Sequence, residues 1–181
     1  MRQVIYSVAN SLDNFIAGPG GAIDWLRMDA DYGMDAFFQS VDAVLLGRKT
    51  AEFALRQHRP KRERKQPAKK KPGATQTYVF SRTLTAPPDP DATLISSNAG
   101  DAVRALKAQP GKNIWLMGGG DLAGSLLTAG VVDELHLAVH PVLLGGGVPL
   151  WGQVERQVSL ELINSKPHPN GVVQLRYRVV G

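Results

Sequence analysis

The sequence of 181 residues contains no cysteine. This absence excludes disulfides, thiolate-bound zinc and a cysteine nucleophile, and it is typical of a protein that works in a reducing compartment. Apolar runs are also short. None reaches the roughly 18 residues that a membrane-spanning helix needs, and the first residues contain no apolar segment typical of a secretion signal. We therefore expect a cytoplasmic protein with no membrane segment.

Several catalytic and metal-binding patterns are missing as well. There is no Gly-x-Ser-x-Gly elbow, so a serine hydrolase is not expected. The four histidines, at positions 58, 136, 140 and 168, are far apart in the sequence except for His136 and His140. On a strand these two residues would share a face but stand about 13 Å apart, which is too far for one metal ion. We therefore expect single exposed histidines and no metal site.

Positive charge is concentrated in one segment. The whole chain has 21 Lys and Arg residues against 16 Asp and Glu residues, a net charge of +5. Nine of the basic residues and only one acid lie between Arg56 and Pro72, so the rest of the chain has a net charge of −3. This segment has three prolines and no large apolar side chain, which predicts a basic surface loop. Nucleic-acid or polyanion binding is the alternative, disfavoured because no aromatic side chain is interleaved to stack on bases.

Apolar and turn-forming residues alternate in a pattern of strands and helices. The expected strands are residues 3–9, 43–46, 77–80, 93–96 and 113–117, and the expected helices are residues 29–41, 50–56, 102–107 and 122–129. This alternation predicts a mostly parallel sheet with helices on both faces. Residues 134–139, 158–163 and 172–179 alternate apolar and polar side chains with no helix between them, which predicts antiparallel C-terminal strands. The sequence therefore predicts one α/β domain over residues 1–181, a three-layer α/β/α sandwich.

Three segments that follow expected strands carry residues suited to anions. They are Gly47-Arg48-Lys49-Thr50, Ser81-Arg82-Thr83, and Gly118-Gly119-Gly120, which is followed by Leu122 at the start of a helix. The carboxyl ends of parallel strands share one edge of a sheet, where glycines and helix N-termini present backbone N–H groups to phosphates. Together the segments predict a site for an extended phosphorylated ligand, most simply a dinucleotide. An ordinary strand-to-helix turn, or close packing of a helix on a strand, is the alternative for each segment alone.

The glycine segment does not match either common phosphate-binding motif. Its spacing runs Gly118, Gly120, Gly124, one residue too long for the Rossmann fingerprint, and it occurs late in the chain. No Gly-Lys-Ser/Thr follows it, so it is not a P-loop. The dinucleotide prediction therefore depends on the three segments together.

Seven short segments, in order along the chain, resemble the dihydrofolate reductase-like proteins. The resemblance is strongest to the reductase domain of bifunctional riboflavin-biosynthesis enzymes, the RibD C-terminal domain, and its stand-alone bacterial relatives. The segments are residues 11–17, 24–26, 46–50, 80–82, 117–120, 133–135 and 141–145. One departure is Asn14, which stands where the family usually has glycine; asparagine tolerates the left-handed backbone that such a turn requires.

The resemblance implies a dihydrofolate reductase-like fold, NADPH as the cofactor and a homodimer. Among the cofactor-binding residues that it implies, Arg48, Thr50, Ser81 and Arg82 would lie near the 2′-phosphate and pyrophosphate. The others are Gly118, Gly119 and Gly120 under the pyrophosphate, Ala9, Ile16 and Ala17 along the nicotinamide, and Gly47 and Leu122 beside these groups.

The activity implied by the resemblance is hydride transfer from NADPH to a small-molecule substrate. That substrate would be a small polar heterocycle or a sugar-like carbonyl, as for 5-amino-6-(5-phosphoribosylamino)uracil reductase. Two alternatives stay open. One is a dihydrofolate or pterin reductase, and the other is a non-enzymatic protein that binds nucleic acid or another polyanion through the basic segment.

The proton donor is the least defined part of the expected site. A dihydrofolate reductase uses one carboxylate on the helix after its tryptophan-containing loop. Here Trp25, a candidate substrate-binding residue, has Asp24 before it and Asp29 and Asp31 after it. We take Asp24 and Asp29 as the candidate catalytic residues. The alternative is that an acid in the first turn of a helix only interacts favourably with the helix dipole.

Overall fold

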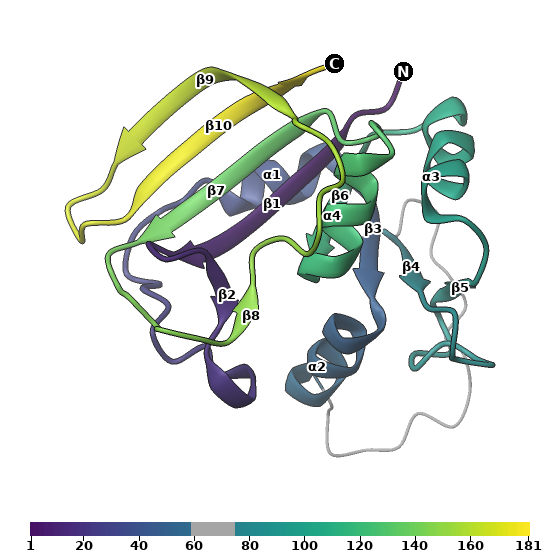
Figure 1. The fold of residues 1–181 in the computed structure, drawn as a ribbon, viewed down its shortest axis with the longest axis horizontal. Helices are drawn as coiled ribbons and strands as arrows, with labels where there is room; N and C mark the ends of the chain where they lie inside the picture. Colours follow the sequence, from purple (N-terminus) through teal and green to yellow (C-terminus); the bar gives the residue numbers. More distant parts are fainter. Residues whose placement is uncertain (59–74) are drawn as a thin grey trace.

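The computed structural model describes residues 1–58 and 75–181 (Figure 1). The predicted basic loop between Arg56 and Pro72 falls mostly on residues 59–74, outside the described residues. Within the described parts of the chain, no helix is both long enough and apolar enough to cross a membrane.

An eight-stranded sheet forms the centre of the fold, in the order β5-β4-β3-β6-β1-β7-β10-β9. The strands from β5 to β7 pair in parallel, and β10 and β9 continue the sheet in antiparallel pairing. Their bounds are β1 Val4–Ser11, β3 Val41–Gly47, β4 Gln76–Phe80, β5 Thr93–Ile95, β6 Asn113–Gly118, β7 Glu134–His140, β9 Ser159–Pro167 and β10 Val173–Val180. The prediction of a mostly parallel sheet with antiparallel C-terminal strands is confirmed.

Helices cover both faces of this sheet, so the predicted three layers are present. Helices α1 (Met34–Ser40) and α2 (Arg48–His58) pack on one face, and α3 (Ala99–Ala108) and α4 (Gly120–Thr128) pack on the other (Figure 1). Successive side chains of β3 point to opposite faces of the sheet, so neighbouring residues of this strand pack against helices on different faces. Leu46 points toward Ala51 of α2, whereas Leu45 joins the larger core with the apolar side chains of α3 and α4. Phe37 of α1 meets Trp115 on the α2 side, with ring centroids 5.6 Å apart.

The helix expected over residues 29–41 is shorter than predicted. It begins only at Met34 because Gly33, at the N-cap, has the left-handed φ of 71°. The carboxylate of Asp31 accepts a hydrogen bond of 2.7 Å from the Gly33 N–H and so fixes a turn before the helix. Asn14 has a φ of 65°, the left-handed backbone expected for that position.

A two-stranded ribbon, absent from the sequence prediction, lies beside the main sheet. It pairs β2 (Phe15–Ala17) with β8 (Val148–Pro149), and a short 3-10 helix, η1 (Pro19–Gly21), follows β2. The hydroxyl of Tyr6, fully buried in the core, donates a hydrogen bond of 2.6 Å to the Leu150 carbonyl just after β8. Burial raises the pKa of this hydroxyl, so it stays protonated and keeps the ribbon against the sheet.

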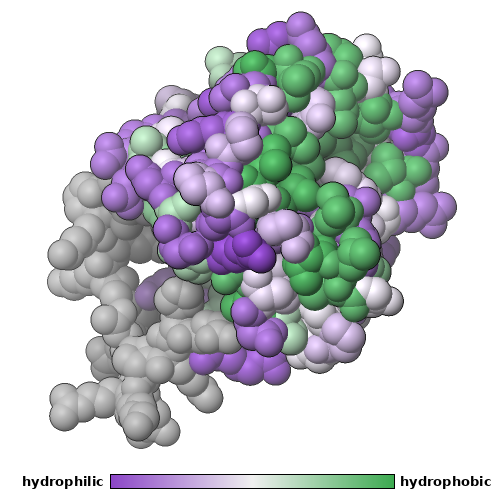
Figure 2. All heavy atoms as spheres, turned by 90° about the vertical axis from the view of Figure 1, so that its left-hand side faces the viewer, coloured by the Kyte–Doolittle hydropathy of each residue, from purple (hydrophilic) through white to green (hydrophobic). Residues whose placement is uncertain are grey.

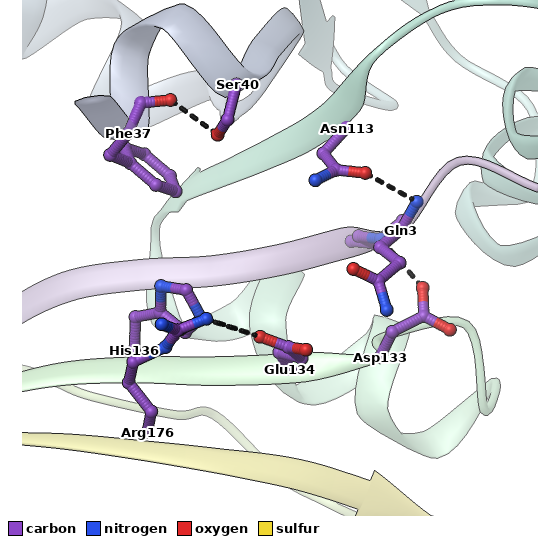
Figure 3. A network of polar contacts seen from close by, with 9 residues as sticks. Gln3, Phe37, Ser40, Asn113, Asp133, Glu134, His136 and Arg176 are labelled. Atoms are coloured by element: carbon purple, nitrogen blue, oxygen red, sulfur yellow. Dashed lines mark hydrogen bonds and ion pairs between the residues drawn. The ribbon is translucent and has the colours of Figure 1, made fainter. Parts of the chain in front are cut away.

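The histidines of β7 are less exposed than predicted. The His136 ring lies 2.8 Å from the Glu134 carboxylate, and Arg176 of β10 contacts the same carboxylate (Figure 3). Burial lowers the pKa of His136, and although burial alone would raise the pKa of Glu134, hydrogen bonds from His136 and Arg176 lower it.

His140 and His168 are buried, with 2% and 8% exposure, so the prediction of single exposed histidines was wrong. His140 is buried because β7 is an inner strand of the sheet and the Trp25 ring packs against the His140 ring. Among the described residues, no group of three or more His, Cys, Asp or Glu side chains could hold a metal ion.

Candidate functional site

A large cleft opens at the carboxyl edge of the parallel strands, with a volume of about 1610 Å³. The ends of β1, β3, β4, β5 and β6 reach it, together with the first residues of α2, α3 and α4. The β2–β8 ribbon provides the facing wall through residues such as Ile16 and Pro149. This is the edge at which open α/β sheets bind ligands.

The cleft brings together nearly all of the residues predicted to bind a cofactor. Those that line it are Ala9, Ile16, Ala17, Gly47, Arg48, Thr50, Ser81, Arg82, Gly119, Gly120 and Leu122. Gly118 lies directly behind this lining, since a Cβ built on it would be 3.8 Å from Thr50 Oγ1 and 3.9 Å from Ile16 Cδ1. Segments separated by up to 113 positions therefore form one surface; their binding roles stay predictions.

The N-terminus of α2 is the most electropositive helix start in the cleft. Its first turn contains no acid but has Arg48 and Lys49, whereas α3 and α4 carry Asp101 and Asp121 in their first turns. Free backbone N–H groups at a helix N-terminus already favour anions, and the two cations add to that preference. The start of α2 is thus suited to a phosphate group.

The α2 start and the glycine turn before α4 touch one another. A Cβ on Gly119 would lie 3.1 Å from Thr50 Oγ1, and one on Gly47 would lie 3.3 Å from the Gly119 nitrogen. Gly118 has the positive φ of 139°, which L side chains rarely adopt, whereas Gly119 has an ordinary φ of −86°. The glycines therefore allow the two turns to meet and form a single anion-suited surface.

Asp13 fixes the facing wall of the cleft. Its carboxylate accepts hydrogen bonds from the backbone of Leu144, at 3.0 Å, and of Gly145, at 2.8 Å. The Ser11 hydroxyl donates to the same carboxylate at 2.6 Å, and this bond, with the two amides, lowers the pKa of Asp13. The loop held in this way leads into Val148, which lines the cleft.

Sequence reasoning missed part of the cleft. Ser96, Ser97 and Asn98 line it directly after β5, and Asn98 also caps α3 by accepting a hydrogen bond of 3.1 Å from the Asp101 N–H. The rule that identified Ser81 and Arg82, polar residues just after a parallel strand, would have found them. No comparable signal marks Val148, because β8 is only two residues long.

The three residues predicted to act on the substrate do not line this cleft. Asp24 is exposed, and Trp25 packs its ring against His140 with centroids 5.2 Å apart. Their neighbours Ile23 and Leu26 are the residues of this segment that line the cleft.

Asp29 lines a separate cavity of about 490 Å³ with Asp31 and His168. The Asn170 amide donates a hydrogen bond of 2.7 Å to its carboxylate, and this bond lowers the pKa of Asp29. A carboxyl group with a lowered pKa is ionised at neutral pH and is a poor proton donor. The roles assigned to Asp24, Trp25 and Asp29 stay predictions that this arrangement does not favour.

Comparison with known proteins identifies the family. Residues 2–174 match the model of the RibD C-terminal domain. The chain belongs to this family. Among the relatives of this RibD C-terminal domain protein is the uncharacterized protein YyaP of Bacillus subtilis (strain 168), which is 39% identical over 179 residues, covering 97% of this chain and 94% of YyaP.

Solved structures agree with the family assignment. A putative riboflavin biosynthesis protein from Shewanella sp. PV-4 superimposes with a TM-score of 0.79 at 28% identity, over 100% of both chains. Dihydrofolate reductase from Enterococcus faecalis, complexed with NADP(H), gives a TM-score of 0.66 at 15% identity and covers 99% of this chain and 97% of its own. The second likeness concerns the fold alone, and it confirms that the fold is dihydrofolate reductase-like.

Proposed function

We propose that this RibD C-terminal domain protein is an NADPH-dependent reductase. Its substrate would be a small polar heterocycle or a sugar-like carbonyl, as for 5-amino-6-(5-phosphoribosylamino)uracil reductase. The observation that carries the proposal is the contact between the α2 start and the glycine turn at Thr50 and Gly119, inside the cleft. The absence of cysteine supports a cytoplasmic location.

The residues of the cleft fit a dinucleotide phosphate. Arg48, Lys49 and Arg82 provide cations, and the starts of α2 and α4 provide backbone N–H groups. When bound, the nicotinamide would supply the hydride, which leaves the protein to bind and orient it. Ala9 and Ile16, two apolar residues of the lining, would hold the ring and exclude water.

The alternatives are less well supported. A dihydrofolate or pterin reductase would need a carboxylate beside its substrate, but Asp24 and Asp29 do not line the cleft. Binding of nucleic acid through the basic segment concerns residues mostly outside the described ones. The residues proposed to bind the dinucleotide, by contrast, all lie among the described ones.

Titration of the purified protein with NADPH, followed by cofactor fluorescence, tests the proposal directly. We expect saturable NADPH binding and no DNA mobility shift at physiological salt. Oxidation of NADPH should then be screened with aminopyrimidine ribityl precursors, dihydrofolate and simple carbonyls. A protein that binds DNA at physiological salt but not NADPH would refute the proposed function.

We also propose a homodimer formed through the exposed face of β9 and β10. β9 is the edge strand, and its Leu160 and Leu162 are 42% and 54% exposed. Leu160 pairs with Val179 of β10 and Leu162 with Tyr177, and these two β10 residues pack against the core on the side of α3 and α4. The two leucines therefore extend the apolar face of the sheet on that side. Figure 2, which faces the side of the molecule where β9 lies, shows hydrophobic residues gathered there. An apolar sheet face with an open edge is suited to a second copy.

A Leu162→Asp variant is expected to be monomeric, because it places a charge in the centre of the proposed interface. Sedimentation should give a mass near 19.5 kDa for the variant and twice that value for the native protein. Met28→Asp is the matched control, since Met28 is 76% exposed but lies outside β9 and β10, and this variant should stay dimeric. A native protein that sediments as a monomer would exclude this interface.

A further inference from the structure

One of the cations that line the cleft, Arg48, already forms an ion pair with an acidic residue, Glu52. The Arg48 Nη1 lies 3.1 Å from Glu52 Oε1 and 3.4 Å from Glu52 Oε2, one turn along α2. Both residues line the cleft, and their side chains are 40% and 36% exposed. The pair is therefore accessible to any ligand that enters the cleft.

Arg82 differs from Arg48 in this respect. It is exposed on the same cleft, and among the residues that the structure describes it has no ion-pair partner. Arg82 can thus meet an anionic ligand without giving up another contact, whereas Arg48 must release Glu52 or share its guanidinium with it.

The two charges of the Arg48–Glu52 pair favour different ribose substituents. An arginine binds a phosphate through charge-assisted hydrogen bonds, and a nearby carboxylate opposes this by competing for the guanidinium and repelling the phosphate. A carboxylate instead accepts a hydrogen bond from a ribose 2′-hydroxyl, the group that NADH has in place of the 2′-phosphate. The pair thus combines one group suited to each cofactor.

We propose that Glu52 is a specificity-determining residue that limits the preference of this cleft for NADPH over NADH. The inference rests on the proposed function, because it assumes that the phosphate of NADPH lies near Arg48. Glu52 weakens NADPH binding by holding Arg48 and by its own charge, and it supports NADH by accepting a hydrogen bond.

The test is a Glu52→Gln variant, titrated with NADPH and with NADH at low and at high salt. We expect NADPH to bind about threefold to tenfold more tightly at low salt, with a smaller gain at high salt, because the groups are partly exposed and screened. NADH should bind equally well or more weakly. Glu161→Gln is the matched control. Glu161 lies on β9, does not line the cleft and forms an exposed ion pair with Arg178 of β10. Removing its charge should change the affinity for neither cofactor.

A double variant separates the action through Arg48 from a general effect of charge. In an Arg48→Met background, the gain in NADPH affinity from Glu52→Gln should shrink by at least half. The inference would be overturned if Glu52→Gln increased NADPH affinity as much in the Arg48→Met background as in the native protein. It would also be overturned if Glu52→Gln changed the affinities for NADPH and NADH equally. Both results would leave the reductase proposal intact. A native protein that binds neither cofactor would refute the proposed function and this inference with it.

Discussion

A Gly119→Val variant is expected to fold and to lose NADPH binding. A Cβ at this position lies 3.1 Å from Thr50 Oγ1, so the two methyl groups of valine would fill the point at which the α2 start and the glycine turn meet. The φ of −86° at Gly119 is one that valine adopts readily. The strained position would be Gly118, whose φ is 139°. Cofactor fluorescence measures the binding, and thermal unfolding measures the fold.

Gly146→Val is the matched control for this experiment. A Cβ on Gly146 would have no atom within 4 Å, and Gly146 does not line the cleft. We expect the control to bind NADPH as the native protein does. Normal NADPH binding by folded Gly119→Val protein would mean that the glycines serve only to pack α4 against the sheet.

Replacing Arg82 by alanine should weaken NADPH binding about tenfold or more and leave NADH binding nearly unchanged. A charge-assisted contact with the 2′-phosphate contributes about 1.5 to 3 kcal/mol, and about 1.4 kcal/mol corresponds to a factor of ten in affinity. NADH lacks this phosphate and therefore loses no contact. The same substitution at Arg48 should also weaken NADPH binding more than NADH binding, and fluorescence titration with both cofactors measures each ratio.

Arg104→Ala controls for the loss of a positive charge. Arg104 is an exposed arginine of α3 that pairs with Asp101 and does not line the cleft. It should leave both affinities unchanged. If Arg82→Ala weakened NADPH and NADH equally, Arg82 would not be the residue that recognises the 2′-phosphate.

The strands of the main sheet were predictable because their sequence patterns are local. Residues 43–46 and 114–117 are continuous apolar runs, as inner parallel strands require, and both became part of the central sheet. The start of α1 was predicted too early, because the apolar spacing of Met34 and Phe37 does not reveal that Gly33 takes a left-handed backbone. The β2–β8 ribbon has no local signal, since contacts with residues far away in the sequence hold it.

Most residues predicted for the site because they follow a parallel strand line the cleft, whereas those predicted around Trp25 do not. Arg48, Ser81 and Gly119 reach the cleft because the sheet determines the position of each strand end. The segment around Trp25 is neither a helix nor a strand. Its sequence therefore has no regular spacing that predicts which side chains reach the cleft. Leu26 lines the cleft, while its neighbour Trp25 packs on His140.

The bonds of Asp13 also affect when the cleft can form during synthesis. Asp13 binds backbone amides 131 and 132 residues later in the chain, at Leu144 and Gly145. A nascent chain that ends at Leu122 already contains both anion-suited turns, but it lacks β7, which pairs with β1, and β8, which pairs with β2. Contacts between such distant residues form late in folding. The cleft is therefore completed only when most of the chain has been made, and a ligand that fills it selectively stabilises the finished protein over its partly folded forms.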